Sequence, residues 1–196
     1  MSKFLIAGLG NIGDEYSFTR HNVGFEIADG LVKSLIREDD SQTIKLFSKD
    51  KLAFLNHSRF KGKQIVIIKP TTYMNLSGKA VNYWLQTEKI PFENLLVVTD
   101  DLALPFGTLR MKKKGSDGGH NGLGDIAATL NSTDYTRLRF GIGNTFAKGQ
   151  QVDYVLKRWN EEEQKLLDER IEKAVEMIKS FISIGVDRTM SLFNNR

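Results

Sequence analysis

A histidine in a polar segment is the first residue with evident chemical potential. His21 lies in the sequence Thr19-Arg20-His21-Asn22, just before residues with the apolar spacing of a helix. An unprotonated imidazole can remove a proton from water as the water attacks a carbonyl carbon, a contribution to rate of about 10²–10⁴-fold. Histidines at such positions also cap helices or face solvent. The local sequence therefore makes His21 a candidate general base and leaves its use open.

Two acids follow an apolar run and would complement a histidine base. Asp100 and Asp101 come directly after residues 95–99, which have the composition of a buried strand. A carboxylate that hydrogen-bonds to an imidazole fixes its tautomer and stabilises the imidazolium formed during reaction. Aspartates also serve as turn residues at strand ends. The local sequence does not choose between the two neighbours.

Three asparagines lie in or beside glycine-containing loops: Asn11, Asn75 and Asn121. A side-chain amide supplies both a donor and an acceptor, so it can orient a carbonyl group or stabilise a developing oxyanion. Asparagines beside glycines are more often turn residues. Each is therefore a candidate for carbonyl recognition, with no role assigned by its local sequence.

Cations and a second histidine gather around a second glycine cluster. Lys112 to Lys114 precede a run of glycines that contains His120. Basic side chains beside exposed backbone N–H groups can bind phosphate, although a solvated charge run gives the same pattern. The net charge is only +4 at pH 7, so the placement of the cations matters more than their total. His120 is a possible second acid–base group, but a backbone contact within the loop is the more ordinary role.

The elements that must position these residues alternate between apolar strands and amphipathic helices. We expect strands at 3–9, 51–60, 63–69, 95–99, 108–113 and 136–142, and helices at 23–36, 74–87, 123–130 and between Asn160 and Gly185. This alternation predicts a single three-layer α/β/α domain over residues 1–196 with a mixed, mostly parallel central sheet. Polar loops after residues 9, 69 and 99 would then share a cleft beyond the carboxyl ends of the strands.

The last of these strands carries its own charge pattern. Residues 136–142 alternate apolar side chains with Arg137 and Arg139. Such alternation is typical of a half-buried strand, and it predicts a basic outer face at this position.

A glycine motif at the end of the first strand suggests a different function. Residues 8–13 satisfy the dinucleotide-binding pattern G-x-G-x-x-G. In that fold the third glycine lies inside the helix whose N-terminus holds the pyrophosphate, whereas here residues 14–20 precede any helical spacing. The expected acid, Asp29, falls inside the predicted helix. An NAD-dependent enzyme is therefore the weaker alternative.

Composition narrows the possible chemistry further. The 196-residue chain has no cysteine and only three histidines, which disfavours disulfides, thiolate metal sites and a histidine-rich zinc centre. We therefore expect chemistry without a metal or cofactor. The apolar run at residues 4–9 is too short for a signal peptide or a membrane span. These features favour a cytoplasmic protein with no membrane partner, and we expect a monomer.

Longer motifs carry a resemblance to a known family. They are GLGNIGDEYSFTRHNVGF from residue 8, KPTTYMNLSG from 69, DDLALP from 100, KGSDGGHNGL from 114 and RLRFGIG from 137. Their order and spacing resemble those of bacterial peptidyl-tRNA hydrolases over nearly the full length of the chain. The resemblance implies hydrolysis of the ester between a peptide, or an N-blocked aminoacyl group, and the 3′ ribose of tRNA. A non-catalytic RNA-binding protein on the same scaffold is the main alternative.

The resemblance also implies roles for the individual residues. It identifies His21 as the catalytic base and prefers Asp100 over Asp101 as its support, and it places Asn11, Asn75 and Asn121 along the cleft. We expect Asn11 and Asn75 to hold the carbonyl group, and Asn121 to position the water or the adjoining peptide.

Recognition of tRNA is implied in the same way. Tyr16 and Tyr73 resemble aromatic residues that contact the substrate, and Lys112 and Arg139 resemble a clamp for the 5′ phosphate of tRNA. The bound region would be the acceptor stem and 3′ end.

Two positions depart from the family pattern. Ile12 stands where a proline is usual, and Ala103 replaces a frequent second acid. The first departure loosens the restraint on the Asn11 loop, and the second removes a carboxylate near the expected site.

Overall fold

The computed structural model describes residues 2–38 and 46–194, and in this part of the chain seven strands form one sheet. The strands are β1 (Lys3–Gly8), β2 (Ser48–Asp50), β3 (Ala53–Phe60), β4 (Lys63–Pro70), β5 (Leu95–Asp101), β6 (Leu109–Lys112) and β7 (Thr136–Gly141). Their spatial order is β2-β3-β4-β1-β5-β7-β6. Neighbouring strands are parallel from β4 to β7, whereas β3 and β6 pair antiparallel with their neighbours. The expected α/β fold with a mixed central sheet is confirmed, and its parallel pairings lie together at the centre of the sheet.

Continuous burial of the central strands follows from their composition. β1 and β5 are buried at all but one position each. Strands covered on both faces require such unbroken apolar runs, because neither side of the sheet meets water.

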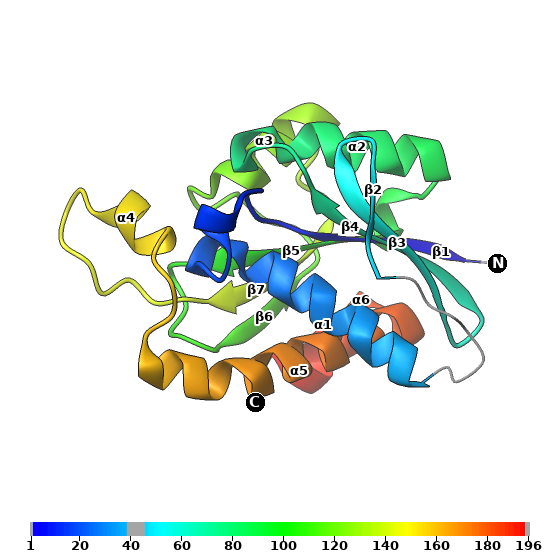
Figure 1. Cartoon of the computed structure of the whole chain (residues 1–196). Coiled ribbons are helices and arrows are strands. Elements are labelled where there is room, and N and C mark those ends of the chain that lie inside the picture. The colour runs from blue at the N-terminus through cyan, green and yellow to red at the C-terminus, as the bar shows by residue number, and fades with distance from the viewer. Residues whose placement is uncertain (1, 39–45, 195–196) are drawn as a thin grey trace.

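Helices cover both faces of the sheet (Figure 1). On one face lie α1 (Val23–Glu38), α5 (Glu161–Ile184) and α6 (Val186–Phe193), and on the other lie α2 (Ser77–Glu88) and α3 (Asn121–Leu130). Each face has its own apolar core, so the molecule has three layers. The short helix α4 (Gln151–Val155) lies on a segment that projects beyond the carboxyl ends of the strands.

Several elements differ from expectation. The predicted helix at 74–87 begins as a 3-10 turn at Met74–Leu76 before α2. The strand predicted to begin at residue 51 begins at Ala53, and β2, α4 and α6 were not predicted. In the glycine motif, two 3-10 turns, Asp14–Tyr16 and Arg20–Asn22, separate Gly13 from α1. The third glycine of the motif therefore lies outside α1, not inside the helix as dinucleotide binding requires.

The expectation of a basic outer face on β7 is wrong. Arg137 is only 1% exposed, and the Arg139 side chain is 13% exposed. The loop after β6 folds over this face, where Arg137 donates hydrogen bonds to the carbonyl oxygens of Gly115, Ser116 and Thr133. The alternating pattern correctly placed Arg137 and Arg139 on one face of β7, but it did not show that a loop covers that face.

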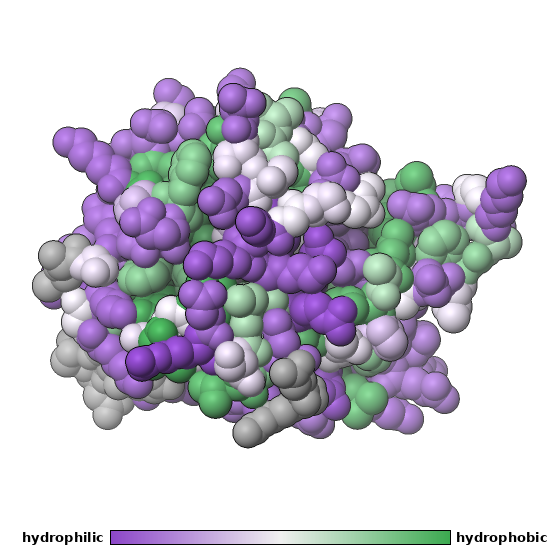
Figure 2. All heavy atoms as spheres, turned by 180° about the vertical axis from the view of Figure 1, so that it is seen from behind, coloured by the Kyte–Doolittle hydropathy of each residue, from purple (hydrophilic) through white to green (hydrophobic). Residues whose placement is uncertain are grey.

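The surface of the molecule is predominantly polar on the side opposite to the view of Figure 1. Hydrophilic side chains gather in a band across the middle of that face (Figure 2). Among the described residues, no helix is both long and apolar enough to cross a membrane.

Candidate active site

A cleft of about 340 Å³ opens where loops meet beyond the carboxyl ends of the central strands. The loop after β1 contributes Asn11, the turn before α1 contributes His21, and the end of β5 contributes Asp100. The start of α3, the segment after β4, and α4 (Gln151–Val155) with the residue that follows it complete its walls. The fold thus gathers residues that are far apart in sequence, as expected for the switch region of an open α/β sheet.

His21 and Asp100 form a close pair at the base of this cleft. Nδ1 of His21 lies 3.0 Å from both carboxylate oxygens of Asp100, and the aspartate is only 4% exposed. In the neutral ring, Nδ1–H donates to the carboxylate and Nε2 keeps its lone pair. Nε2 is therefore the atom able to accept a proton from water.

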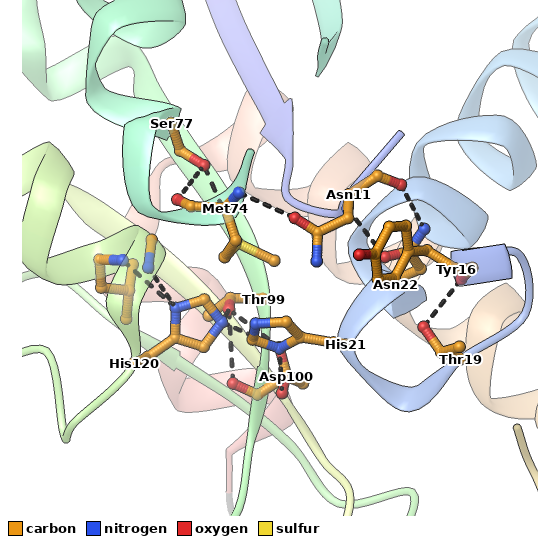
Figure 3. Close-up of polar contacts among 12 residues, drawn as sticks. Asn11, Tyr16, Thr19, His21, Asn22, Met74, Ser77, Thr99, Asp100 and His120 are labelled. Atoms are coloured by element: carbon orange, nitrogen blue, oxygen red, sulfur yellow. Dashed lines mark hydrogen bonds and ion pairs between the residues drawn. The ribbon is translucent and has the colours of Figure 1, made fainter. Parts of the chain in front are cut away.

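A second histidine contacts the same carboxylate through its other ring nitrogen. Nε2 of His120 lies 2.9 Å from Oδ1 of Asp100 and 2.6 Å from Oγ1 of Thr99. Its Nδ1 accepts hydrogen bonds from the backbone N–H groups of Gly122 and Leu123 and so caps α3. Figure 3 shows the two rings meeting at Asp100. Because Nδ1 is an acceptor, Nε2 carries the proton of His120 and donates to the aspartate.

The interactions within this group shift the pKa values of Asp100 and His21 in opposite directions. Burial alone would raise the pKa of Asp100, but the two imidazole rings outweigh it and hold that pKa well below its usual range. Burial alone would lower the pKa of His21, but the charge and hydrogen bond of Asp100 outweigh burial and raise that pKa. Asp100 is therefore ionised at neutral pH and stabilises the imidazolium form of His21.

Asn11 is fixed with one side of its amide free. Its backbone N–H donates to Oδ1 of Asn22 and its carbonyl accepts from Nδ2 of Asn22, both at 2.9 Å. Its Oδ1 accepts from the backbone N–H of Met74 at 2.8 Å. Since the oxygen is engaged, Nδ2 is left as a donor on the side of the cleft that holds the histidines (Figure 3).

Close backbone approach places the His21 turn beside the Asn11 loop. A methyl group on Gly24 would overlap the carbonyl oxygen of Leu9, and one on Gly8 would overlap the carbonyl oxygen of Gly24. The first turn of α1 therefore packs directly on the end of β1, which only glycine at both positions permits.

A buried ion pair holds the same turn from behind. Nη2 of Arg20 lies 2.7 Å from Oε2 of Glu163, and both side chains are nearly buried. Nη1 of Arg20 donates to the carbonyl oxygen of Arg158 at 3.1 Å. Glu163 also accepts from the backbone N–H of Asn160 in the capping box of α5. Arg20 thus joins the turn that carries His21 to the segment between α4 and α5.

All the site residues predicted from sequence line this cleft except Lys112: His21, Asp100, Asn11, Tyr16, Tyr73, Asn75, Asn121 and Arg139. Lys112 is exposed on β6. Lys112 lies directly opposite Arg137 of β7, so the two side chains are on the same face. Arg139 is two residues after Arg137 on β7 and therefore shares that face as well. Of the two departures from the family pattern, Ile12 is 38% exposed beside Asn11, and Ala103 is exposed outside the lining.

Sequence reasoning missed Asn22, Arg20 and the contact of His120 with Asp100. Asn22 and Arg20 act through backbone and ion-pair contacts, for which a local pattern carries no signal. The expected backbone contact of His120 is present, but its ring reaches Asp100 as well.

His21, His120 and Asp100 are also residue types that can bind a metal ion. Their ligand atoms lie within 4.8 Å of one another, a spacing that a metal ion can span. To bind a cation through Nε2, however, His120 would have to move its proton to Nδ1, which faces two backbone N–H donors. The hydrogen bonds therefore suit proton transfer better than metal coordination.

Known proteins share both the sequence and the fold. The family model described as peptidyl-tRNA hydrolase matches residues 5–196. Relatives named peptidyl-tRNA hydrolase from Phocaeicola vulgatus and Cytophaga hutchinsonii are 52% and 53% identical over 194 residues, covering 99% of this chain and 100% and 99% of theirs. A crystal structure of peptidyl-tRNA hydrolase from Acinetobacter baumannii is 33% identical, with a TM-score of 0.86 and coverage of 97% of this chain and 94% of that one. The chain therefore belongs to the peptidyl-tRNA hydrolase family, which hydrolyses the ester bond of peptidyl-tRNA.

Proposed function

We propose that His21 is the general base of this hydrolysis and that Asp100 supports it. Nε2 of His21 accepts a proton from a water molecule as its oxygen attacks the ester carbonyl carbon. The tetrahedral intermediate then collapses, the ribose oxygen leaves, and the imidazolium returns the proton to it. The observation that carries this proposal is the hydrogen bond from Nδ1 of His21 to the buried carboxylate of Asp100, because it leaves Nε2 basic.

The asparagines supply uncharged donors and acceptors around the carbonyl group. Nδ2 of Asn11 donates to the developing oxyanion, since its oxygen is held by Met74. Asn75 and Asn121 lie exposed along the cleft. We assign Asn75 to the carbonyl group, and Asn121 to the water or the adjoining peptide.

Recognition of tRNA uses the outer parts of the cleft. Tyr73 is 62% exposed and Tyr16 partly exposed, so both offer an aromatic surface to the 3′ adenosine or the peptide. Lys112 and Arg139 bind the 5′ phosphate of the acceptor stem. The whole chain acts as one domain, without a cofactor, as a monomer in the cytoplasm.

Release of free tRNA from N-acetyl-aminoacyl-tRNA tests the base assignment. His21→Ala should lower turnover by about 10²–10⁴-fold while the affinity for the substrate stays unchanged, since the ring acts on the water. His57→Ala is the matched control, because that histidine lies on β3 outside the cleft. Near-normal turnover by the His21 variant would rule out its role as the base.

A further inference from the structure

One of the two cations assigned to phosphate binding already has a carboxylate partner. Nη1 of Arg139 lies 3.2 Å from Oδ2 of Asp101, and each side chain is only 13% exposed. Nη2 of Arg139 donates to the carbonyl oxygen of Ser116 at 2.9 Å. Lys112 is exposed instead, with no acidic partner in residues 2–38 and 46–194. The charge of Arg139 is therefore offset by a carboxylate within the protein, whereas no carboxylate of the described residues offsets the charge of Lys112.

Asp101 is fixed in its place beside Arg139. Its Oδ1 accepts a hydrogen bond from the backbone N–H of Ala103 at 2.8 Å, and its backbone lies at the end of β5, in register with Gly141 of β7. Its carboxylate pairs with Arg139, whereas that of its neighbour Asp100 pairs with His21. The two adjacent acids thus serve two different sites.

Arg139 can still receive a phosphate, but at a reduced affinity. A guanidinium has five N–H donors, and the contacts with Asp101 and Ser116 use two of them. Nε of Arg139 is buried without a partner. Because Arg139 lines the cleft, the second N–H on each of Nη1 and Nη2 is the donor that a ligand would use. A phosphate bound there shares one cation with a fixed carboxylate, and the repulsion between the two anions opposes binding.

We propose that Asp101 weakens the phosphate clamp. As a counter-anion within the protein, it lowers the affinity of Arg139 for the tRNA 5′ phosphate and so keeps product release fast. This inference rests on the proposed clamp and deepens it. The 5′ phosphate is identical in peptidyl-tRNA and in the product tRNA. Binding it more tightly would stabilise both equally, which does not accelerate ester cleavage and slows departure of the product.

Asp101→Asn tests this role, because the amide keeps an oxygen for the Ala103 N–H and removes the charge. Deacylated tRNA with a 5′ phosphate should bind about tenfold more tightly to the variant. Product inhibition should strengthen by the same factor, and the logarithmic salt slope of binding should steepen by about one. The tightening should be much smaller for tRNA that ends in a 5′ hydroxyl. The pH dependence of kcat/KM should not change, since Asp101 does not contact His21.

Two further variants separate the possible causes. Asp117→Asn removes another acid from the cleft lining, one whose carboxylate accepts from Gly119 and does not pair with Arg139. It should leave the 5′-phosphate preference unchanged. In Arg139→Gln, the Asp101→Asn change should have no further effect on tRNA affinity, because the cation that it frees is gone.

The contrary outcomes are equally distinct. Weaker tRNA binding by Asp101→Asn would mean that the carboxylate orients Arg139 for phosphate, and equal tightening for 5′-hydroxyl tRNA would mean a general charge effect. Either result overturns the proposal that Asp101 lowers the affinity of the clamp, while leaving the clamp itself in place. If Arg139→Gln alone keeps the 5′-phosphate preference, the clamp assignment itself fails, and the inference fails with it.

Discussion

The two histidines of the cleft share one neighbour and have different chemistry. Both donate to Asp100, but His120 also uses its second nitrogen as a helix cap, whereas the second nitrogen of His21 is left for the reaction. The backbone contacts of α3 therefore decide which ring can act as a base. The sequence around each histidine does not predict this distinction. The distinction depends on tertiary contacts, in which Asp100 at the end of β5 meets a different ring nitrogen of each histidine.

The pH dependence of turnover should report the His21–Asp100 pair. The rate rises with pH as His21 loses its proton, around a pKa that Asp100 raises above 6.5. In Asp100→Asn that cause is lost while burial, which lowers the pKa, remains, so the rise should move to lower pH. The plateau should fall by up to about 10⁴-fold, because the amide favours the wrong tautomer. Profiles of kcat/KM that rise at the same pH would contradict the pairing.

His120 should contribute separately to stability and to turnover. His120→Ala removes the cap of α3 and should lower the free energy of unfolding by about 0.5–2 kcal/mol. His120→Asn restores a capping oxygen but is too short to reach Asp100 as well. Urea unfolding should therefore distinguish the two variants. Both should lose turnover, because both remove the hydrogen bond from His120 to Asp100. Equal stability of both variants would show that the cap contributes little.

The candidate site was predictable to the extent that its residues lie in loops with distinctive local motifs. Local sequence made His21, both aspartates and the three asparagines candidates, and the family resemblance chose Asp100 over Asp101. All of these residues line the cleft. Asn22 was missed because its function is to hold the backbone of Asn11, eleven residues away. Arg137 was misread because its alternation fits exposure as well as burial under a loop. Contacts between distant segments decide both cases.

Among the elements, the N-terminus of α5 is connected to the turn that carries His21. Glu163 serves both the capping box and the buried ion pair with Arg20. Asn160→Ala removes only the cap and should cost about 1 kcal/mol of unfolding free energy. Glu163→Ala also leaves Arg20 buried without its partner and should cost about 3–5 kcal/mol. Denaturant unfolding of both variants measures the difference, and equal losses would show that the ion pair is dispensable.

Elements with strong apolar periodicity were predicted from the sequence, and weakly patterned ones were not. β1, α1, β5 and α5 have unbroken apolar runs or clear helical stripes, since each must bury a face. β2 has three exposed polar residues, and its pairing with β3 forms it. α6 was missed because Gly185, which ends α5, also caps the next helix.

For the whole molecule, charge placement should govern the salt dependence of tRNA binding. Lys112→Ala should weaken binding and reduce the logarithmic salt slope by about one, because one phosphate contact is lost. Lys33→Ala removes the same charge from an exposed position on α1, which packs on the face of the sheet opposite to α2 and α3. This variant should leave the slope unchanged. Binding measured over a range of salt concentrations gives both slopes. An unaltered slope for Lys112→Ala would mean that this lysine only faces solvent.

The order of strands also sets how much of the chain must be made before the cleft is complete. The first strand to leave the ribosome, β1, lies between β4 and β5, and β5 in turn pairs with β7. A nascent chain that ends before α3 has His21 and Asp100 but neither the His120 contact nor the wall that holds Asn121. The cleft is therefore completed late in translation.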